Sequence, residues 1–355
     1  MNGAPRSQFV EPPNPSLLRA MALSVLGLLA AFIMSVAIGP VNIPPGIALA
    51  VLGAKLGGMS LPIPSFQTFS TILLEIRLPH ALLLLLTGAA LAGSGAGYQG
   101  LFRNPLADPY LIGVASGAGL GAVVAMSIRW PADLAGLYVI PAAAFVGALV
   151  TVMIVYGLAR IGKSVPTTTL ILAGVAISSF ATSLTSFLML RSNEELRRAT
   201  GWLLGGSLMS GWQPVLALLP YVLLGLGALL LSGHALNVLQ FGEEQANQMG
   251  LAAERVKFWL ILAASLTTAS AVAFSGIIGF VGLIVPHLIR LLWGTDYRRL
   301  IPLSIVSGGT ALLLADLLAR VVLAPQVLPV GIVTALAGAP FFLWVLRRAK
   351  NQGYW

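Results

Sequence analysis

The chain is poor in the residues that usually carry chemistry or brace a small soluble fold. Among its 355 residues there are no cysteines, three histidines and only 9% charged residues. The absence of cysteine excludes a disulfide framework and thiolate metal sites. His80, His234 and His287 lie too far apart in sequence to form a spaced ligand motif, so we expect no resident metal, haem or other cofactor.

The scarcity of charge also excludes an ordinary soluble domain, in which about 25% of residues are charged. Hydrophobic residues make up 57% of the chain and the mean hydropathy is +0.93. The apolar segments are apolar on all sides, whereas the strands of a transmembrane barrel alternate apolar and polar residues. We therefore predict an all-α polytopic membrane protein.

Ten apolar segments are long enough, or nearly so, to cross a bilayer as helices. They lie at 18–38, 78–98, 110–128, 137–159, 167–190, 213–232, 257–275, 277–291, 300–322 and 329–346. The first is too long for the core of a signal peptide, so we interpret it as a retained helix. Ser275-Gly276 and Gly279 mark a turn that separates the seventh helix from the eighth.

An even number of crossings places both termini on one side of the membrane. Most of the Lys and Arg residues fall on the side of the termini, which predicts that this side is cytoplasmic. The domain prediction is a cytoplasmic tail at 1–17, a transmembrane domain at 18–348 and a second cytoplasmic tail at 349–355. The basic residues are scattered over short loops, so the net charge of +9 indicates no binding of nucleic acid.

One segment matches the spacing of a phosphate-binding Walker A loop. It reads Gly157-Leu-Ala-Arg-Ile-Gly-Lys-Ser164. A genuine loop of this kind follows a strand and opens a helix, whereas this one follows a long apolar segment and precedes Pro166. We therefore interpret it as the end of a helix at a membrane face, with Arg160 and Lys163 as anchors.

The loop at 236–257 is long and polar in a chain whose loops are otherwise short. Gly242 and Gly250 bracket a stretch that favours a short helix, and Glu243 and Glu244 open it. A helical excursion of this kind is typical of a docking site for a partner protein; the alternative is a solvated loop.

Small and ionisable residues mark further positions within the apolar segments. Glycines at intervals of four, namely Gly93 and Gly97 and then Gly113, Gly117 and Gly121, predict close helix packing. Asp316 and Arg320 are four residues apart and therefore share a helix face, where we expect them to pair. His287 follows Pro286, and we expect it to bond a backbone carbonyl that the proline leaves free.

Several longer motifs occur in a particular order between residues 70 and 348. They include Arg77-Leu-Pro-His80, Tyr98-Gln-Gly-Leu-Phe-Arg-Asn-Pro-Leu-Ala-Asp-Pro109, Gly279-Phe-Val-Gly-Leu-Ile-Val-Pro-His287, Leu314-Ala-Asp-Leu-Leu-Ala-Arg320 and Pro329-Val-Gly-Ile-Val-Thr-Ala-Leu-Ala-Gly-Ala-Pro340. Together they resemble the permease subunits of type II ABC importers, the FecCD family, whose members carry ferric siderophores, haem or cobalamin.

The resemblance implies a type II importer permease fold that is not itself an enzyme. A second permease subunit, most simply a second copy, two ABC ATPase subunits that hydrolyse ATP, and a periplasmic or lipid-anchored binding protein would complete the complex in a bacterial or archaeal plasma membrane. The substrate is expected to be an iron chelate or haem, with cobalamin as a close alternative.

The resemblance also assigns roles to individual residues. The cytoplasmic gate is expected at Asn104, Leu106, Thr167 and Thr168, and the ATPase coupling helix at Gly242, Glu243, Glu244, Ala246 and Gly250. Arg77, His80 and Arg320 are expected to meet acidic residues of the binding protein. The related cobalamin permeases have arginine where this chain has His80, so that contact would be weaker or dependent on pH.

Two other function classes remain open from the residues alone. A secondary transporter or channel driven by an ion gradient normally needs acids or histidines near the bilayer midplane, and Asp316 is the one acid clearly inside a predicted span. An intramembrane enzyme would need a nucleophile with a base or a metal site, and neither pattern occurs in the sequence.

Overall fold

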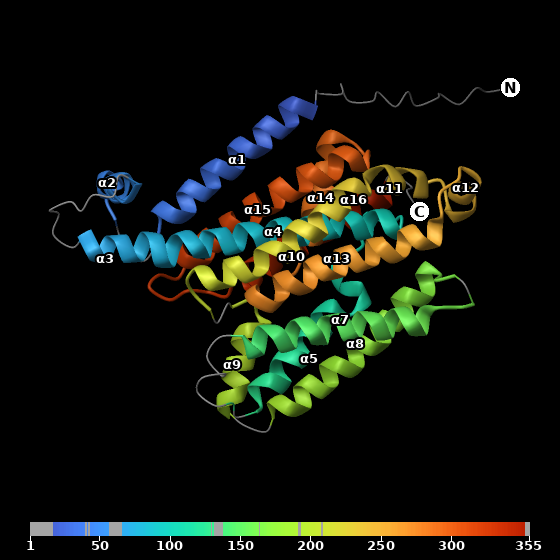
Figure 1. The fold of residues 1–355 in the computed structure, drawn as a ribbon, viewed down its shortest axis with the longest axis horizontal. Helices are drawn as coiled ribbons and strands as arrows, with labels where there is room; N and C mark the ends of the chain where they lie inside the picture. The colour runs from blue at the N-terminus through green and yellow to red at the C-terminus, as the bar shows by residue number, and fades with distance from the viewer. Residues whose placement is uncertain are drawn as a thin grey trace.

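The computed structural model describes residues 17–39, 41, 43–56, 66–128, 130, 138–162, 164–190, 193–206 and 209–351 (Figure 1). Most of the tail at 1–17, the end of the tail at 349–355 and Lys163 lie outside the described residues. Within these ranges the chain is helical, and its one extended pairing is an isolated bridge between Ile161 and Ser164.

The helices follow one another along the chain with short connections. They are α1 Leu17–Ala37, α2 Pro45–Leu56, α3 Phe66–Ser70, the π-helix η1 Thr71–Arg77, α4 Leu78–Leu101, the 3₁₀-helix η2 Pro109–Ile112, α5 Val114–Met126, α7 Val139–Ala159, α8 Thr167–Met189, α9 Asn193–Leu203, α10 Trp212–Leu231, α11 Gly233–Leu239, α12 Glu243–Gln248, α13 Ala253–Ser275, α14 Val281–Trp293, α15 Tyr297–Val321 and α16 Val330–Asn351.

All ten predicted apolar segments form helices. Seven helices in the described part of the chain are long and apolar enough to cross a membrane, and α5, α14 and α16 provide shorter apolar helices. A helix is the favoured form because a backbone in lipid must satisfy its own N–H and C=O groups. The all-α polytopic fold is therefore confirmed.

The structure corrects several predicted boundaries. Helix α4 continues α3 and η1, so that one apolar helical stretch runs over Phe66–Leu101, 12 residues before the predicted start at 78. Helix α14 begins at Val281 rather than 277, because Gly276 and Phe280 have positive φ angles of 75° and 70° and the residues between them are not helical. Helices α2 and α9 were not predicted.

Helix α4 is the central element of the fold. It packs against α10, α13, α14 and α15, while α5, α7 and α8 form a second group that α9 closes at one end (Figure 1). Glycines allow these close approaches: Gly88 lies against Gly308 of α15, Gly95 against Gly282 of α14, and Gly117 against Gly147 of α7. The predicted close packing holds at Gly93, Gly97, Gly113, Gly117 and Gly121, because a Cβ at each would meet a neighbouring helix, and Gly113 also takes a left-handed conformation before α5.

A methyl group at Gly95 is expected to destabilise the fold. The Cβ of Gly95→Ala would overlap the carbonyl oxygen of Gly282, and neither backbone can give way without moving a helix. We expect a loss of about 1–3 kcal/mol of stability, measured as a lower melting temperature in detergent. Gly227→Ala in α10 is the matched control, because its Cβ meets nothing within 4 Å; an equal loss in both variants would contradict the packing argument.

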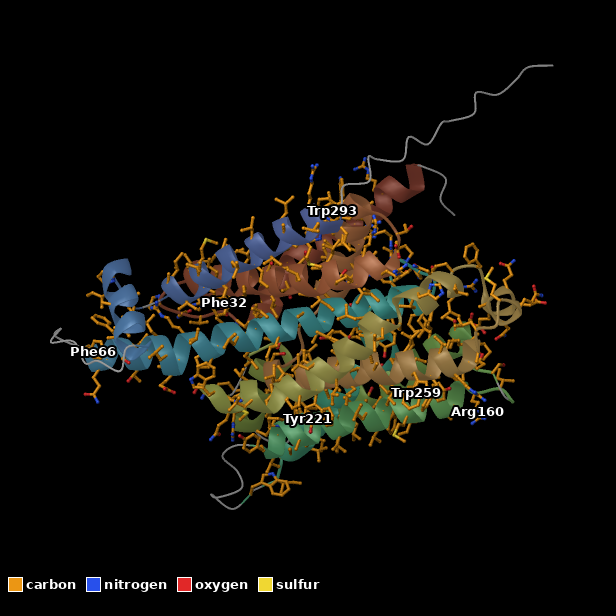
Figure 2. The ribbon with its side chains drawn as sticks, turned by 45° about the horizontal axis from the view of Figure 1, so that its top comes forward. Phe32, Phe66, Arg160, Tyr221, Trp259 and Trp293 are labelled. Atoms are coloured by element: carbon orange, nitrogen blue, oxygen red, sulfur yellow. The ribbon has the colours of Figure 1, made fainter. Side chains whose placement is uncertain are left out.

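Many large apolar side chains lie on the outer surface of the bundle. Trp259 of α13, labelled in Figure 2, lies on this surface. The exposed fraction of Trp259 is 63%, and that of Leu231 of α10 is 87%. Such an apolar surface is typical of a protein covered by lipid or by a partner subunit. Trp202 of α9 behaves differently: it is buried, with 2% exposed.

The bundle has two distinct ends, named here by the short helices they carry. The α2 end holds α2, the last turn of α1 and the start of α16; the α12 end holds α11, α12 and the start of α13 (Figure 1). Helix α1 runs toward the α2 end and α16 runs away from it. The start of α1 and the end of α16 therefore both lie toward the α12 end. This arrangement agrees with the predicted even number of crossings.

Candidate functional site

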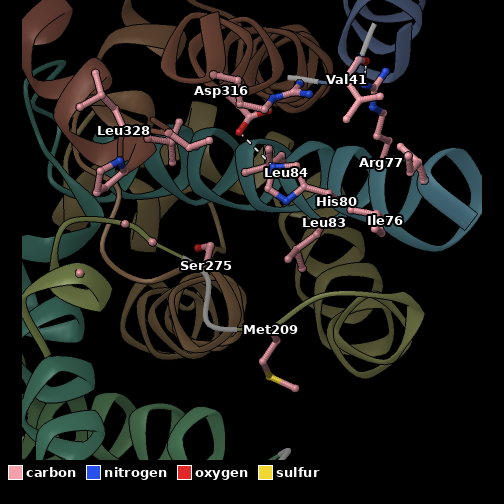
Figure 3. A pocket seen from close by; sticks show the side chains of 18 residues that line it. Val41, Ile76, Arg77, His80, Leu83, Leu84, Met209, Ser275, Asp316 and Leu328 are labelled. Carbon is pink, nitrogen blue, oxygen red and sulfur yellow. Dashed lines mark hydrogen bonds and ion pairs between the residues drawn. The ribbon is translucent and has the colours of Figure 1, made fainter. Parts of the chain in front are cut away.

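A cavity of about 530 Å³ opens at the α2 end between α4, α15 and the start of α16 (Figure 3). Its wall is mostly apolar, with Leu83, Leu84, Met209 and Leu328 among the lining residues. Against this apolar wall stand the ionisable side chains of Arg77, His80, Asp316 and Arg320. The cavity therefore joins an apolar surface to one concentrated group of charges.

Asp316 is the centre of this charged group. Its Oδ2 lies 2.8 Å from Nε of Arg320, and its Oδ1 lies 3.0 Å from Nε2 of His80. Asp316 and Arg320 are buried, with 4% and 8% of their surfaces exposed. The predicted pairing of Asp316 with Arg320 is confirmed, and His80 extends the pair into a triad that joins α4 to α15.

Both arginines also hold the end of α1. Nη1 of Arg77 donates to the carbonyls of Val36 at 3.1 Å and Ala37 at 2.8 Å. Nη1 of Arg320 donates to Ile38 O at 2.9 Å, and its Nη2 donates to Ser35 O at 3.1 Å. The last carbonyls of a helix lack intrahelical donors and carry partial negative charge, so cations there stabilise the helix end.

The three predicted docking residues differ in how accessible they are. Arg77 and Arg320 direct their donors inward to α1, and Arg77 is only 6% exposed. His80 is the accessible member of the three predicted docking residues, with 37% of its side chain exposed. The contacts of Arg77 join positions 40 and 41 residues apart, and those of Arg320 join positions 282 and 285 residues apart, so no local sequence pattern could have predicted them.

The α12 end carries the predicted docking helix. Helix α12 lies between Gly242 and Gly250, whose φ angles of 109° and 85° suit glycine, and the predicted short helix is confirmed. Ala246 is completely buried on its inner side, while Glu244 is exposed. Glu243 is only partly exposed, because its Oε1 accepts a hydrogen bond of 3.0 Å from Nζ of Lys257.

The predicted gate residues also lie at the α12 end. Asn104 stabilises the turn after α4, since its Oδ1 accepts from the backbone N–H of Leu106 at 2.9 Å. A cavity of about 440 Å³ lies between this turn, α11 and the start of α15. Thr167 begins α8, and Thr168 is exposed beside it.

The structure tests two further predictions, one for the Walker-like segment and one for His287. The Walker-like segment closes α7, and α8 starts only at Thr167, so the strand–loop–helix order of a phosphate loop is absent from this described segment. The expected bond of His287 is wrong: its Nδ1 is buried and has no hydrogen-bond partner in the described residues.

The match to a family model decides the identity of the chain. The model of the FecCD transport family matches residues 27–348, which is nearly the whole helical bundle. The chain belongs to the FecCD transport family.

Relatives of this FecCD protein match it over most of their length. The cobalamin import system permease BtuC of Halobacterium salinarum is 43% identical over 342 residues, covering 94% of this chain and 90% of the relative. The hemin transport system permease HmuU of Yersinia pestis is 40% identical over 319 residues, covering 86% and 94%. An uncharacterised ABC transporter permease of Bacillus subtilis, YvrB, is 42% identical over 321 residues, covering 85% and 91%.

A solved structure confirms the fold of this FecCD protein. An inward-facing metal-chelate type ABC transporter superposes with a TM-score of 0.79 at 30% identity, covering 94% of this chain and 99% of the other. The predicted resemblance, the type II importer permease fold and the function as the transmembrane permease subunit of an ABC importer are thereby confirmed. The protein is a multi-pass membrane transport subunit.

Proposed function

We propose that this permease, paired with a second copy, forms the translocation pathway for a metal chelate with a macrocyclic or similarly large organic ligand. The supporting observation is the high identity over nearly the whole chain to two permeases named for cobalamin and for haem. Both of those substrates hold a metal in a tetrapyrrole-type ring. Haem or an iron chelate is the first choice, and cobalamin is the close alternative.

The orientation follows from the charges at the two ends. Arg255 lies at the start of α13, and four further arginines lie at the same end of the bundle, namely Arg103 after α4, Arg160 after α7, and Arg298 and Arg299 at the start of α15. This concentration of arginine favours the α12 end as the cytoplasmic side. Two ABC ATPase subunits would dock there against α12, and ATP would be hydrolysed on those partners. A binding protein would deliver substrate at the α2 end, in a bacterial or archaeal plasma membrane.

Docking at the α2 end would use the cavity rim rather than free arginines. His80 is the accessible hydrogen-bond donor for an acidic residue of the binding protein, whereas Arg77 and Arg320 serve that surface by fixing the end of α1. At the α12 end, Asn104 and Leu106 from one turn and Thr167 and Thr168 from the start of α8 would close the exit until ATP drives opening.

Reconstituted transport tests this function. The permease, its ATPase and its binding protein are placed in proteoliposomes, and uptake of haemin, a ferric siderophore and cyanocobalamin is compared. We expect ATP-dependent uptake of one of the three and its loss with an ATPase-inactive partner. The visible spectrum of the purified complex then identifies the chelate, because all three absorb distinctively.

The same assay separates the proposal from an ion-driven mechanism. Uptake that persists without the ATPase and binding protein, but collapses when the proton gradient is dissipated, would contradict the proposed function. Hydrolysis of ATP by the purified permease alone would contradict the assignment of the catalytic step to a partner.

A further inference from the structure

Lys257 is a buried lysine near the start of α13 that none of the roles above uses. Its side chain is 5% exposed, although lysine is rarely buried without partners. All three of its donors are used: Nζ lies 2.7 Å from Val165 O, 3.0 Å from Glu243 Oε1 and 2.9 Å from Glu254 Oε1. These three acceptors belong to three different segments of the chain.

One of those segments leads directly into the proposed gate. Val165 is held at both of its backbone groups, since its carbonyl accepts from Lys257 and its N–H donates to Glu254 Oε2 at 3.2 Å. We call this pair of contacts the Val165 clamp. Only Pro166, with its fixed φ of −63°, separates the clamp from Thr167 at the start of α8. A displacement of the clamp therefore reaches α8 without a flexible joint.

Another of the segments is the proposed coupling helix. Glu243 is the first residue of α12, and its bond to Lys257 ties that helix to the clamp. A second bond fixes α12 to the same unit, because Asn247 Oδ1 accepts from the N–H of Ala253 at 3.1 Å at the start of α13. Helix α12, the start of α13 and Val165 are thus joined through a few short hydrogen bonds.

We propose that Lys257 is the positioning residue that transmits movement of α12 to the start of α8. The proposal rests on the proposed function, in which the ATPase moves α12 and α8 carries the gate. The hydrogen bonds from Lys257 to Glu243 and to the carbonyl of Val165 are short and have a charged donor. An ATPase-driven shift of α12 would therefore move Glu243, Lys257 and Val165 in the same direction. Without Lys257, α12 could move while Val165 stayed in place.

The variant Lys257→Met tests this role by removing the donor to the carbonyl of Val165 and to both carboxylates. Methionine keeps the apolar length of the side chain, and the two carboxylates it leaves behind are 38% and 34% exposed, so water can solvate them. Arg255→Gln is the matched control. It also removes a positive charge, but Arg255 is exposed, lies two residues before Lys257 and takes no part in the hydrogen bonds to Val165, Glu243 and Glu254. Glu254→Gln is a second variant, which loosens the N–H side of the clamp.

The measurement uses the assembled complex with its ATPase and binding protein in proteoliposomes. For Lys257→Met we expect unchanged ATPase content and continuing ATP hydrolysis, with uptake per ATP reduced about tenfold. Glu254→Gln should reduce uptake per ATP in the same direction, and Arg255→Gln should match the wild type. Because the chain has no cysteine, Ser164→Cys offers a single spin-label site beside the clamp, and its ATP-dependent spectral change should disappear in Lys257→Met.

The outcomes separate this proposal from the function on which it rests. Normal uptake per ATP in Lys257→Met, or an unchanged spectral response at position 164, would overturn the role of Lys257. Loss of the ATPase subunits from the Lys257→Met complex would also overturn it, because the lysine would then serve assembly alone. Failure of the wild-type complex to take up substrate with ATP would overturn the proposed function itself, and this proposal with it.

Discussion

Replacing Asp316 with asparagine is expected to lower the stability of the protein by about 3 kcal/mol, because it leaves the buried guanidinium of Arg320 without its counter-charge. Asp316 is the acid that meets both Arg320 and His80, so one substitution breaks the whole triad. The melting temperature in detergent measures the loss. Glu75→Gln removes an exposed carboxylate from the same end of the bundle and should change stability by no more than about 0.5 kcal/mol.

The same variant should loosen the end of α1. Arg320 donates to Ser35 and Ile38, and a guanidinium without its acid is free to turn toward water in the cavity. A cysteine introduced at Ser35, which is 1% exposed, should then react with a maleimide faster in Asp316→Asn than in the otherwise unchanged chain.

A double variant separates the loss of a charge pair from the loss of packing. Asp316→Leu with Arg320→Leu removes both charges, and replacing a buried ion pair by apolar residues is often neutral. It should therefore be less destabilised than Asp316→Leu alone. Equal stability of Asp316→Asn and the wild type would show that the triad contributes nothing to folding.

The sequence predicted those parts of the fold that depend on one segment at a time. Each apolar stretch of about 20 residues must form a helix in lipid, whatever its neighbours do. The short helix α12 was also predictable, because Gly242 and Gly250 mark its two ends locally. Helix α9 was missed because its exposed Arg197 and Arg198 make the segment too polar to be counted among the apolar helices.

The contacts of the candidate sites were less predictable, because they join distant segments. Asp316 and Arg320 could be paired from their spacing of four residues, but the addition of His80 joins positions 236 residues apart. Lys257 gave one local signal, an acid three residues earlier at Glu254. Its bond to Val165 spans 92 residues, and neither periodicity nor charge pattern encodes that distance.

Two neighbouring glutamates on α12 should have separable effects, although the family resemblance assigns both of them to ATPase coupling. Glu244 is exposed and makes no ion pair within the described part of the chain, so its charge is available to a partner. Glu243 is turned toward Lys257. We therefore expect Glu244→Arg to remove most of the ATPase subunits from the purified complex, with transport lost in proportion.

Glu243→Gln should instead leave the ATPase subunits in place. The amide loses the charge-assisted bond to Lys257, which weakens the link between α12 and Val165 while the outward face of the helix keeps Glu244. Two measurements distinguish the variants. The amount of co-purified ATPase should fall for Glu244→Arg, and the uptake per ATP should fall for Glu243→Gln. If both variants lost the ATPase equally, α12 would act as one docking surface, and the inward contact of Glu243 would have no separate part in transport.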